Sequence, residues 1–176
     1  MRIITGKYKG RHFDIPHTFT ARPTTDFAKE NIFNVLMGYI NLDGADALDL
    51  FAGTGSISLE LLSRGCSSVI SIEQKWEHYT FIRQCVDKLN DNNIQLIRGD
   101  AFRFIKTCKR QFDFVFADPP YGLRELPLIP DLILSSAILR DNGIFVFEHG
   151  KRHHFQDNPH FVDHREYGAV NFSIFR

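Results

Sequence analysis

The segment Asp49-Leu50-Phe51-Ala52-Gly53-Thr54-Gly55-Ser56 places two glycines directly after an apolar run that begins at Ala45. The run predicts a buried strand, and the apolar spacing after the glycines predicts a helix that ends at Gly65. Strand, glycine turn and helix in this order are typical of the first unit of an α/β sheet.

The alternation of strand and helix continues towards the C-terminus. Further strands are expected at 69–72, 94–97, 112–117 and 144–147, and the last helix between them is expected over 128–139. Five strand–helix alternations imply parallel strands with right-handed crossovers, which is a doubly wound α/β sheet. The final residues, 161–175, predict an antiparallel hairpin with its turn at Gly168.

The N-terminal residues 1–23 predict a basic hairpin and a linker, ahead of a core over 24–176 in a single domain of 1–176. Short β-type runs at 2–5 and 11–15 are joined by a turn with a glycine at each end. Five basic residues stand here against one acid; they are Arg2, Lys7, Lys9, Arg11 and Arg22. Such a segment can contact phosphates, and the alternative is that it is simply solvated. Thr24, Thr25 or Asp26 is expected to cap the helix that follows.

Composition narrows the class of protein. The 176 residues are 43% hydrophobic and 24% charged, with a net charge of zero, so the chain does not coat nucleic acid through its overall field. The three cysteines and eight histidines show no disulfide framework and no spacing of metal ligands. No signal peptide and no membrane-length apolar run is present, so we expect a cytoplasmic protein without a metal.

Acidic residues follow the first three strands, at the edge where open α/β sheets bind ligands. Asp49 suits a cationic ligand end, and Gly53 and Gly55 let backbone approach a ligand closely. Glu73, 24 residues after Asp49, suits ribose hydroxyls, and Asp100 suits an adenine amino group. Each acid alone is more often a helix cap, but together they describe a pocket for an adenosine with an amino-acid tail.

The tetrapeptide Asp118-Pro119-Pro120-Tyr121 follows the fourth strand. The prolines fix the backbone, so the Asp118 carboxylate and the Pro119 carbonyl are held as two acceptors. They can take hydrogen bonds from the two N–H groups of an exocyclic amine and direct its lone pair at a methyl donor. Tyr121 can stack on a base that has left its helix. The predicted catalytic residues are Asp118, Pro119, Pro120 and Tyr121.

Further segments carry a resemblance to a known family. The tetrapeptide and the glycine segment resemble the amino-methyltransferase pattern. Together with Arg2–Arg11 and with Arg22-Pro23-Thr24-Thr25-Asp26, followed by Lys29-Glu30 and Phe33-Asn34, they resemble the RsmD-type 16S rRNA guanine-N2 methyltransferases. Two positions depart from that family's pattern, namely Ala21 and Phe27.

The resemblance implies a seven-stranded, Rossmann-like methyltransferase fold with S-adenosylmethionine as donor. The implied target is the N2 amine of guanine 966 in 16S rRNA, in the small ribosomal subunit or its assembly intermediate. The implied cofactor pocket is lined by Asp49, Phe51, Ala52, Gly53, Thr54, Gly55, Glu73, Asp100 and Ala101. The residues implied to contact RNA are Lys7, Lys9, Arg11, Arg22, Thr24 and Thr25.

Three alternatives remain. An adenine-N6 or protein-glutamine methyltransferase would normally carry Asn in place of Asp118, or an added recognition domain. A nonenzymatic RNA-binding protein on the same fold would be indicated by loss of Asp118 or of the glycines. A small dehydrogenase would need a third fingerprint glycine where this chain has Ser58.

Overall fold

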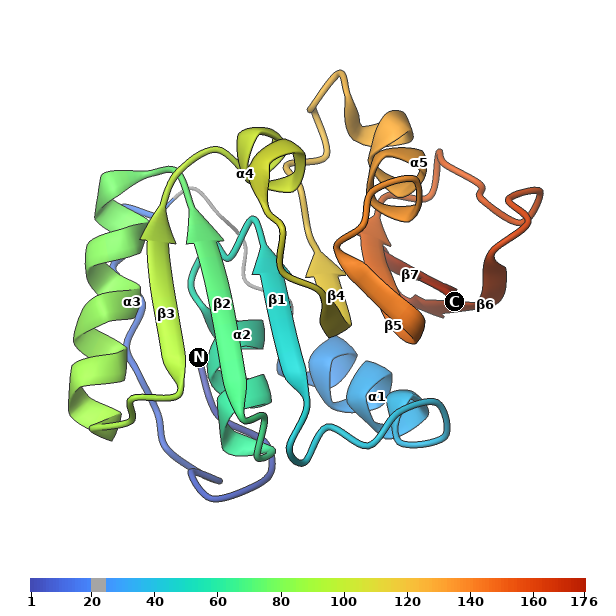
Figure 1. Cartoon of the computed structure of the whole chain (residues 1–176). Coiled ribbons are helices and arrows are strands. Elements are labelled where there is room, and N and C mark those ends of the chain that lie inside the picture. Colours follow the sequence, from blue (N-terminus) through green and yellow to red (C-terminus); the bar gives the residue numbers. More distant parts are fainter. Residues whose placement is uncertain (20–24) are drawn as a thin grey trace.

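The computed structural model describes residues 1–19 and 25–176 (Figure 1). Within them seven strands form one sheet in the order β3-β2-β1-β4-β5-β7-β6. Strands β1 to β5 run parallel, and β7 is antiparallel to both β5 and β6. The strands are β1 Asp46–Leu50, β2 Ser68–Glu73, β3 Ile94–Arg98, β4 Phe112–Ala117, β5 Leu139–His149, β6 Phe161–Tyr167 and β7 Val170–Phe175. The doubly wound, seven-stranded architecture is confirmed.

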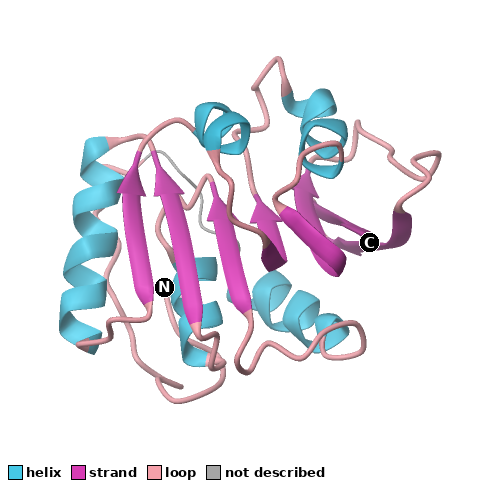
Figure 2. Ribbon diagram, in the orientation of Figure 1, coloured by secondary structure: helices cyan, strands magenta, loops and turns pink. Residues whose placement is uncertain are grey.

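Helices cover both faces of the sheet (Figure 2). Apolar residues of α1 Asp26–Leu36, α2 Ser56–Ser63 and α3 Trp76–Leu89 share one buried cluster with one face of the sheet. Those of α4 Ala101–Thr107 and α5 Ile129–Leu134, with the 3-10 turn Leu126–Leu128 before α5, share the cluster on the other face. Apart from Asp113, the central strand β4 is apolar, as expected for a strand that is buried on both faces. Among the described residues, no helix has the length and apolar character needed to cross a membrane.

Two boundaries near the C-terminus differ from the prediction. The expected helix over 128–139 ends at Leu134, because the Ser136 hydroxyl donates to the Ile133 carbonyl and competes with the helical pattern. The fifth strand begins at Leu139, five residues earlier than expected. Its pairing with β4 shifts register there and Asn142 has a φ of 63°, so polar residues occupy an irregular strand start that periodicity does not reveal.

The N-terminal residues form an irregular hairpin. Its strands meet in a single bridge between Arg2 and His12, supported by hydrogen bonds from the Ile3 N–H to the Arg11 carbonyl and from the Phe13 N–H to the Met1 carbonyl. The turn packs on the C-terminal end of α2, where a Cβ on Gly6 would lie 1.8 Å from the Ser63 carbonyl oxygen. The hairpin turn therefore lies at the edge opposite to the arrowheads of β1 to β3 (Figure 1).

A buried lysine joins this hairpin to the sheet's helical layer. The fully buried Lys29 donates to the Arg2 carbonyl at 2.6 Å and to the Ser56 hydroxyl at 2.9 Å, and lies 3.9 Å from the buried Glu60 carboxylate. Glu60 in turn accepts the N–H groups of Ile4 and Thr5. Burial lowers the pKa of Lys29, and the Glu60 charge opposes that shift.

Candidate active site

Strand register brings the predicted site residues to one edge of the sheet. Leu50 pairs with Ala117, and Ala117 pairs with Phe147. Leu50 also pairs with Ile72 on its other side. The residues that follow these pairs therefore lie at neighbouring strand tips; they are Phe51, Glu73, Asp118 and Glu148.

Every second residue of the glycine turn after β1 has a left-handed backbone conformation. Phe51, Gly53 and Gly55 have φ values of 62°, 58° and 76°. Phe51 is an unusual occupant of that region, and such strain concentrates at functional sites. Gly55 is required for a second reason, because a Cβ there would lie 2.9 Å from Ile82 of α3. The turn thus presents backbone at the N-terminus of α2, between β1 and α3.

The Asp49 side chain is buried at the end of β1, with 1% of its surface exposed. The hydroxyl of Ser58 on α2 donates to it at 2.5 Å, and the Ser71 hydroxyl lies 2.8 Å from that of Ser58. Burial raises the pKa of Asp49 to about 7, and the bond from Ser58 works against this. Ser58 stands where the dinucleotide fingerprint has its third glycine, and here it orients the carboxylate.

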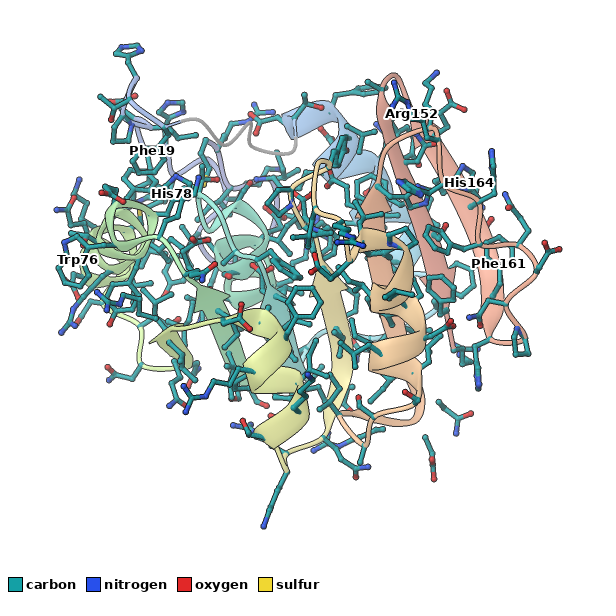
Figure 3. The ribbon with its side chains drawn as sticks, turned by 90° about the horizontal axis from the view of Figure 1, so that it is seen from above. Phe19, Trp76, His78, Arg152, Phe161 and His164 are labelled. Atoms are coloured by element: carbon teal, nitrogen blue, oxygen red, sulfur yellow. The ribbon has the colours of Figure 1, made fainter. Side chains whose placement is uncertain are left out.

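The Glu73 carboxylate holds the glycine turn in place through hydrogen bonds to backbone N–H groups. One oxygen accepts the Gly53 N–H at 2.7 Å, and the other accepts the Lys75 N–H at 2.7 Å. His78 on α3 lies 3.8 Å from the second oxygen, and its ring packs on Phe19 at a centroid distance of 4.3 Å (Figure 3). Each carboxylate oxygen has a further lone pair for a ligand hydroxyl.

Asp100 caps α4 by accepting the Arg103 N–H at 2.8 Å. The capping interpretation of this residue is therefore confirmed, and its role towards an adenine amino group stays a prediction. Ala101 begins the helix and is buried. The next residue, Phe102, packs edge-on against Phe51 at 5.8 Å, so an aromatic pair lies between the glycine turn and the Asp100 tip.

The Asp118-Pro119-Pro120-Tyr121 turn leaves β4 next to these groups. The Asp118 N–H lies 3.5 Å from the Leu50 carbonyl oxygen, which ties the turn to β1. Asp118 is half-buried and Pro119 is buried, whereas Pro120 and Tyr121 are exposed. Burial, and then the charges of Glu148 and Asp49, raise the pKa of Asp118 well above its ordinary value. A carboxylate with a raised pKa is a better proton acceptor near neutral pH.

Tyr121 has an exposed ring and an anchored hydroxyl. The residue is 47% exposed, while its hydroxyl donates to the buried Glu148 carboxylate at 3.1 Å. Glu148 was missed by sequence reasoning, although it follows the apolar run of the fifth strand. The rule that selected Glu73 and Asp118 from their strand ends would also have selected it.

Three of the residues predicted to contact RNA lie in or next to the hairpin turn, apart from these strand tips. Lys7 pairs with Asp91 at 2.5 Å and Arg11 donates to the Lys88 carbonyl, both at the C-terminal end of α3. Lys9 is exposed in the hairpin turn. Thr25 accepts the Ala28 N–H and caps α1, as expected. Arg22 and Thr24 lie outside the described residues.

The donor groups at this edge fit S-adenosylmethionine. Buried carboxylates of Asp49 and Glu73 suit an ammonium group and ribose hydroxyls, and the glycine backbone at the N-terminus of α2 leaves room for close approach. The edge carries acids suited to the amino-acid and ribose parts of such a ligand and a half-buried aromatic pair, and the proline-braced turn lies next to them.

Comparison with known proteins agrees with this assignment. A protein-family model described as Conserved hypothetical protein 95 matches residues 1–176. The chain is 36% identical to the "Putative rRNA methyltransferase YlbH" of Bacillus subtilis, over 86% of this chain and 83% of that protein. It is 31% identical to "Ribosomal RNA small subunit methyltransferase D" of Escherichia coli, over 84% and 74%. The solved "Putative methyltransferase yhhF" of Escherichia coli superposes with a TM-score of 0.86 at 27% identity, covering 99% of this chain and 96% of that one.

The site geometry and these matches lead to one assignment. The residues that the family resemblance predicted for donor binding and amine recognition lie at adjoining strand tips, and the family match spans the whole chain. The chain belongs to the RsmD-type family of S-adenosylmethionine-dependent rRNA methyltransferases.

Proposed function

We propose that the chain methylates the exocyclic N2 amine of one guanine in 16S rRNA, in the small ribosomal subunit or an assembly intermediate. The observation that carries this proposal is the Asp118-Pro119-Pro120-Tyr121 turn, half-buried and braced at the tip of β4, next to the glycine turn of β1. Its place of action would be the cytoplasm, where ribosomal subunits assemble.

The two acceptors, on Asp118 and Pro119, would make a poorly nucleophilic amine more reactive. The lone pair of a guanine N2 is delocalised into the ring, so the amine is a weak nucleophile. The Asp118 carboxylate and the Pro119 carbonyl would accept its two N–H groups and favour a tetrahedral nitrogen. Because the prolines fix both acceptors in advance, little reorganisation is needed when the base arrives.

Asp49, Glu73 and the turn from Phe51 to Gly55 would hold the donor, with Asp100 and Ala101 at the adenine end. When bound, S-adenosylmethionine would supply a methyl group from its sulfonium sulfur to the guanine nitrogen, and the sulfur would keep the electron pair of the broken sulfur–carbon bond. Asp118 would take the proton released from the nitrogen, or pass it to water. Tyr121 would stack on the extruded base.

RNA contact would involve two regions. Arg22, Thr24 and Thr25 would border the site. Lys7, Lys9 and Arg11 would touch phosphates farther away, since the hairpin turn packs at the other edge of the sheet. A large rRNA particle can reach both edges of a protein this small.

The test compares small-subunit rRNA from cells with and without the gene, by primer extension and mass analysis. We expect one guanine to lose a single methyl group, and a plasmid copy to restore it. Unchanged rRNA would overturn the proposed substrate. A missing methyl on adenine would instead assign the site to an adenine-N6 enzyme.

A further inference from the structure

Glu148 occupies an unusual position for a carboxylate. It ends the apolar run of β5, has only 4% of its surface exposed, and follows the pair that joins Ala117 to Phe147. Because neighbouring parallel strands lie about 4.8 Å apart, its backbone stands directly beside that of Asp118. A buried acid next to another acid is costly, so its retention needs an explanation.

Tyr121 provides the explanation. Its hydroxyl donates to Glu148 at 3.1 Å, and the edge of its ring lies against Gly150, where an added Cβ would stand 3.5 Å from the ring. The ring is therefore held at two points, by a hydrogen bond at its tip and by backbone at its side. The residue as a whole is still 47% exposed.

We propose that Glu148 is a positioning residue: it anchors the Tyr121 hydroxyl so that the ring stands ready as a stacking surface for the target base beside Asp118. This inference rests on the proposed function, since it assumes that a base enters at Asp118. A ring fixed before binding loses less conformational entropy when a base stacks on it, and it sets the plane in which the amine meets its acceptors.

A carboxylate is well suited to this task. A hydrogen bond from a phenol to a charged acceptor is stronger than one to a neutral acceptor. Burial keeps water from competing for the bond. A phenylalanine at position 121 would still stack, but its ring would lack the hydrogen bond that fixes its tip.

The experiment is a double-mutant cycle on methyl transfer to small subunits purified from cells that lack this methyl group. We expect Glu148→Ala to lower kcat/KM by about 10- to 100-fold, mostly in kcat, and Tyr121→Phe to have a similar effect. The double variant should be within about twofold of Tyr121→Phe alone, because the same anchor is removed only once. Additive losses would overturn the inference.

The conservative variant separates anchoring from charge. Glu148→Gln keeps an oxygen that accepts the Tyr121 hydroxyl, so it should retain activity within about threefold of the natural enzyme. Activity as low as that of Glu148→Ala would show that the charge, rather than the anchor, is needed. This variant also serves if Glu148→Ala fails to fold, which thermal melting would reveal.

Tyr8 offers a matched control. Its hydroxyl donates to the Asp91 carboxylate at 2.7 Å, at the opposite edge of the sheet, so Tyr8→Phe removes a bond of the same kind away from the strand tips. It should leave kcat unchanged, and an equal loss of kcat would count against a local role for Glu148. If the natural enzyme leaves guanine N2 unmethylated, the proposed function fails; if it methylates and the cycle is additive, only this inference fails.

Discussion

Asp118 combines two properties that favour proton acceptance. It is fixed by the prolines that follow it, and its pKa is raised by burial and by the carboxylates of Glu148 and Asp49. Glu73 differs from it, because both oxygens of that carboxylate already accept backbone N–H groups, from Gly53 and Lys75. Removal of Asp118 should affect the chemical step more than ligand binding.

We therefore expect Asp118→Ala to lower turnover by about 10² or more while the affinity for S-adenosylhomocysteine stays nearly unchanged. Single-turnover methylation of small subunits measures the first quantity, and calorimetric titration measures the second. Lost cofactor affinity with turnover preserved would show that Asp118 belongs to the donor pocket.

Asp49 leads to a prediction about pH. Its pKa of about 7 means that the free protein holds a proton there in mildly acidic solution, whereas a ligand ammonium group needs the charged carboxylate. The dissociation constant of S-adenosylhomocysteine should therefore rise as pH falls below 7, by up to about tenfold per unit. Calorimetry between pH 5.5 and pH 8 tests this, in a range chosen about 1 unit or more on each side of that pKa.

The Asp49 carboxyl group also affects stability. Ligand binding needs its charged form, whereas folding favours its protonated form. Because its pKa is higher in the folded chain than its ordinary value of 3.8, the folded state binds more protons between those two values. The free energy of unfolding contributed by Asp49 thus falls as pH rises through that window. Asp49→Asn should flatten the dependence in denaturant titrations and weaken ligand binding at pH 8. An unchanged pH dependence in the variant would contradict this assignment.

At the scale of elements, the glycine turn determines how α2 meets β1. Gly55 has a φ of 76° and contacts Ile82 of α3, so its position is constrained both by backbone conformation and by space. Gly168, in the turn between β6 and β7, has a φ of 67°, but a methyl group added there would meet nothing within 4 Å. Alanine substitutions at these two glycines therefore distinguish the loss of stability from a left-handed backbone from the loss caused by a steric clash.

Gly168→Ala should lower the free energy of unfolding by about 1 kcal/mol, from left-handed backbone alone. Gly55→Ala should lower it by about 3 kcal/mol, because the methyl group also displaces Ile82. It should also weaken S-adenosylhomocysteine binding, which Gly168→Ala should not do. Urea unfolding gives the free energy of unfolding, and calorimetry gives the affinity for S-adenosylhomocysteine. Equal losses of stability in the two variants would show that α3 can shift to make room for the methyl group without destabilising the fold.

At the scale of the whole molecule, the strand tips that carry Glu73 and Asp118 and the turn of the basic hairpin lie at opposite ends of the parallel strands (Figure 1). The Lys29 and Glu60 network ties the hairpin to α1 and α2, so its position follows from buried polar contacts. RNA bound at the hairpin would therefore act on affinity and not on the reacting atoms.

Lys9→Glu combined with Arg11→Glu should raise KM for small subunits by about threefold to tenfold and leave kcat unchanged, since each lost phosphate contact weakens binding without touching the acceptor turn. The effect should shrink as salt concentration rises. A KM that equals that of the natural enzyme at low salt would leave the hairpin with a structural role only.

Much of the fold, and the meeting of the candidate site residues at one edge of the sheet, follows from chain order. Alternating strands and helices force parallel pairing, and parallel pairing brings every strand end to one edge. Asp49, Glu73 and Asp118 could therefore be placed together from their positions alone. The irregular start of β5 could not be predicted, because its polar residues are held in place by pairing with β4 and not by their own preferences.

The sequence by itself determined the sheet and the set of residues that meet at one edge of it, because these depend on strand order and local backbone chemistry. Only the tertiary structure decided that Ser58 orients Asp49, that Glu148 anchors Tyr121 and that the hairpin turn packs at the far edge. Those contacts join residues that are 9, 27 and about 55 positions apart. Such contacts depend on strand register and on helix packing, which no local pattern in the chain encodes.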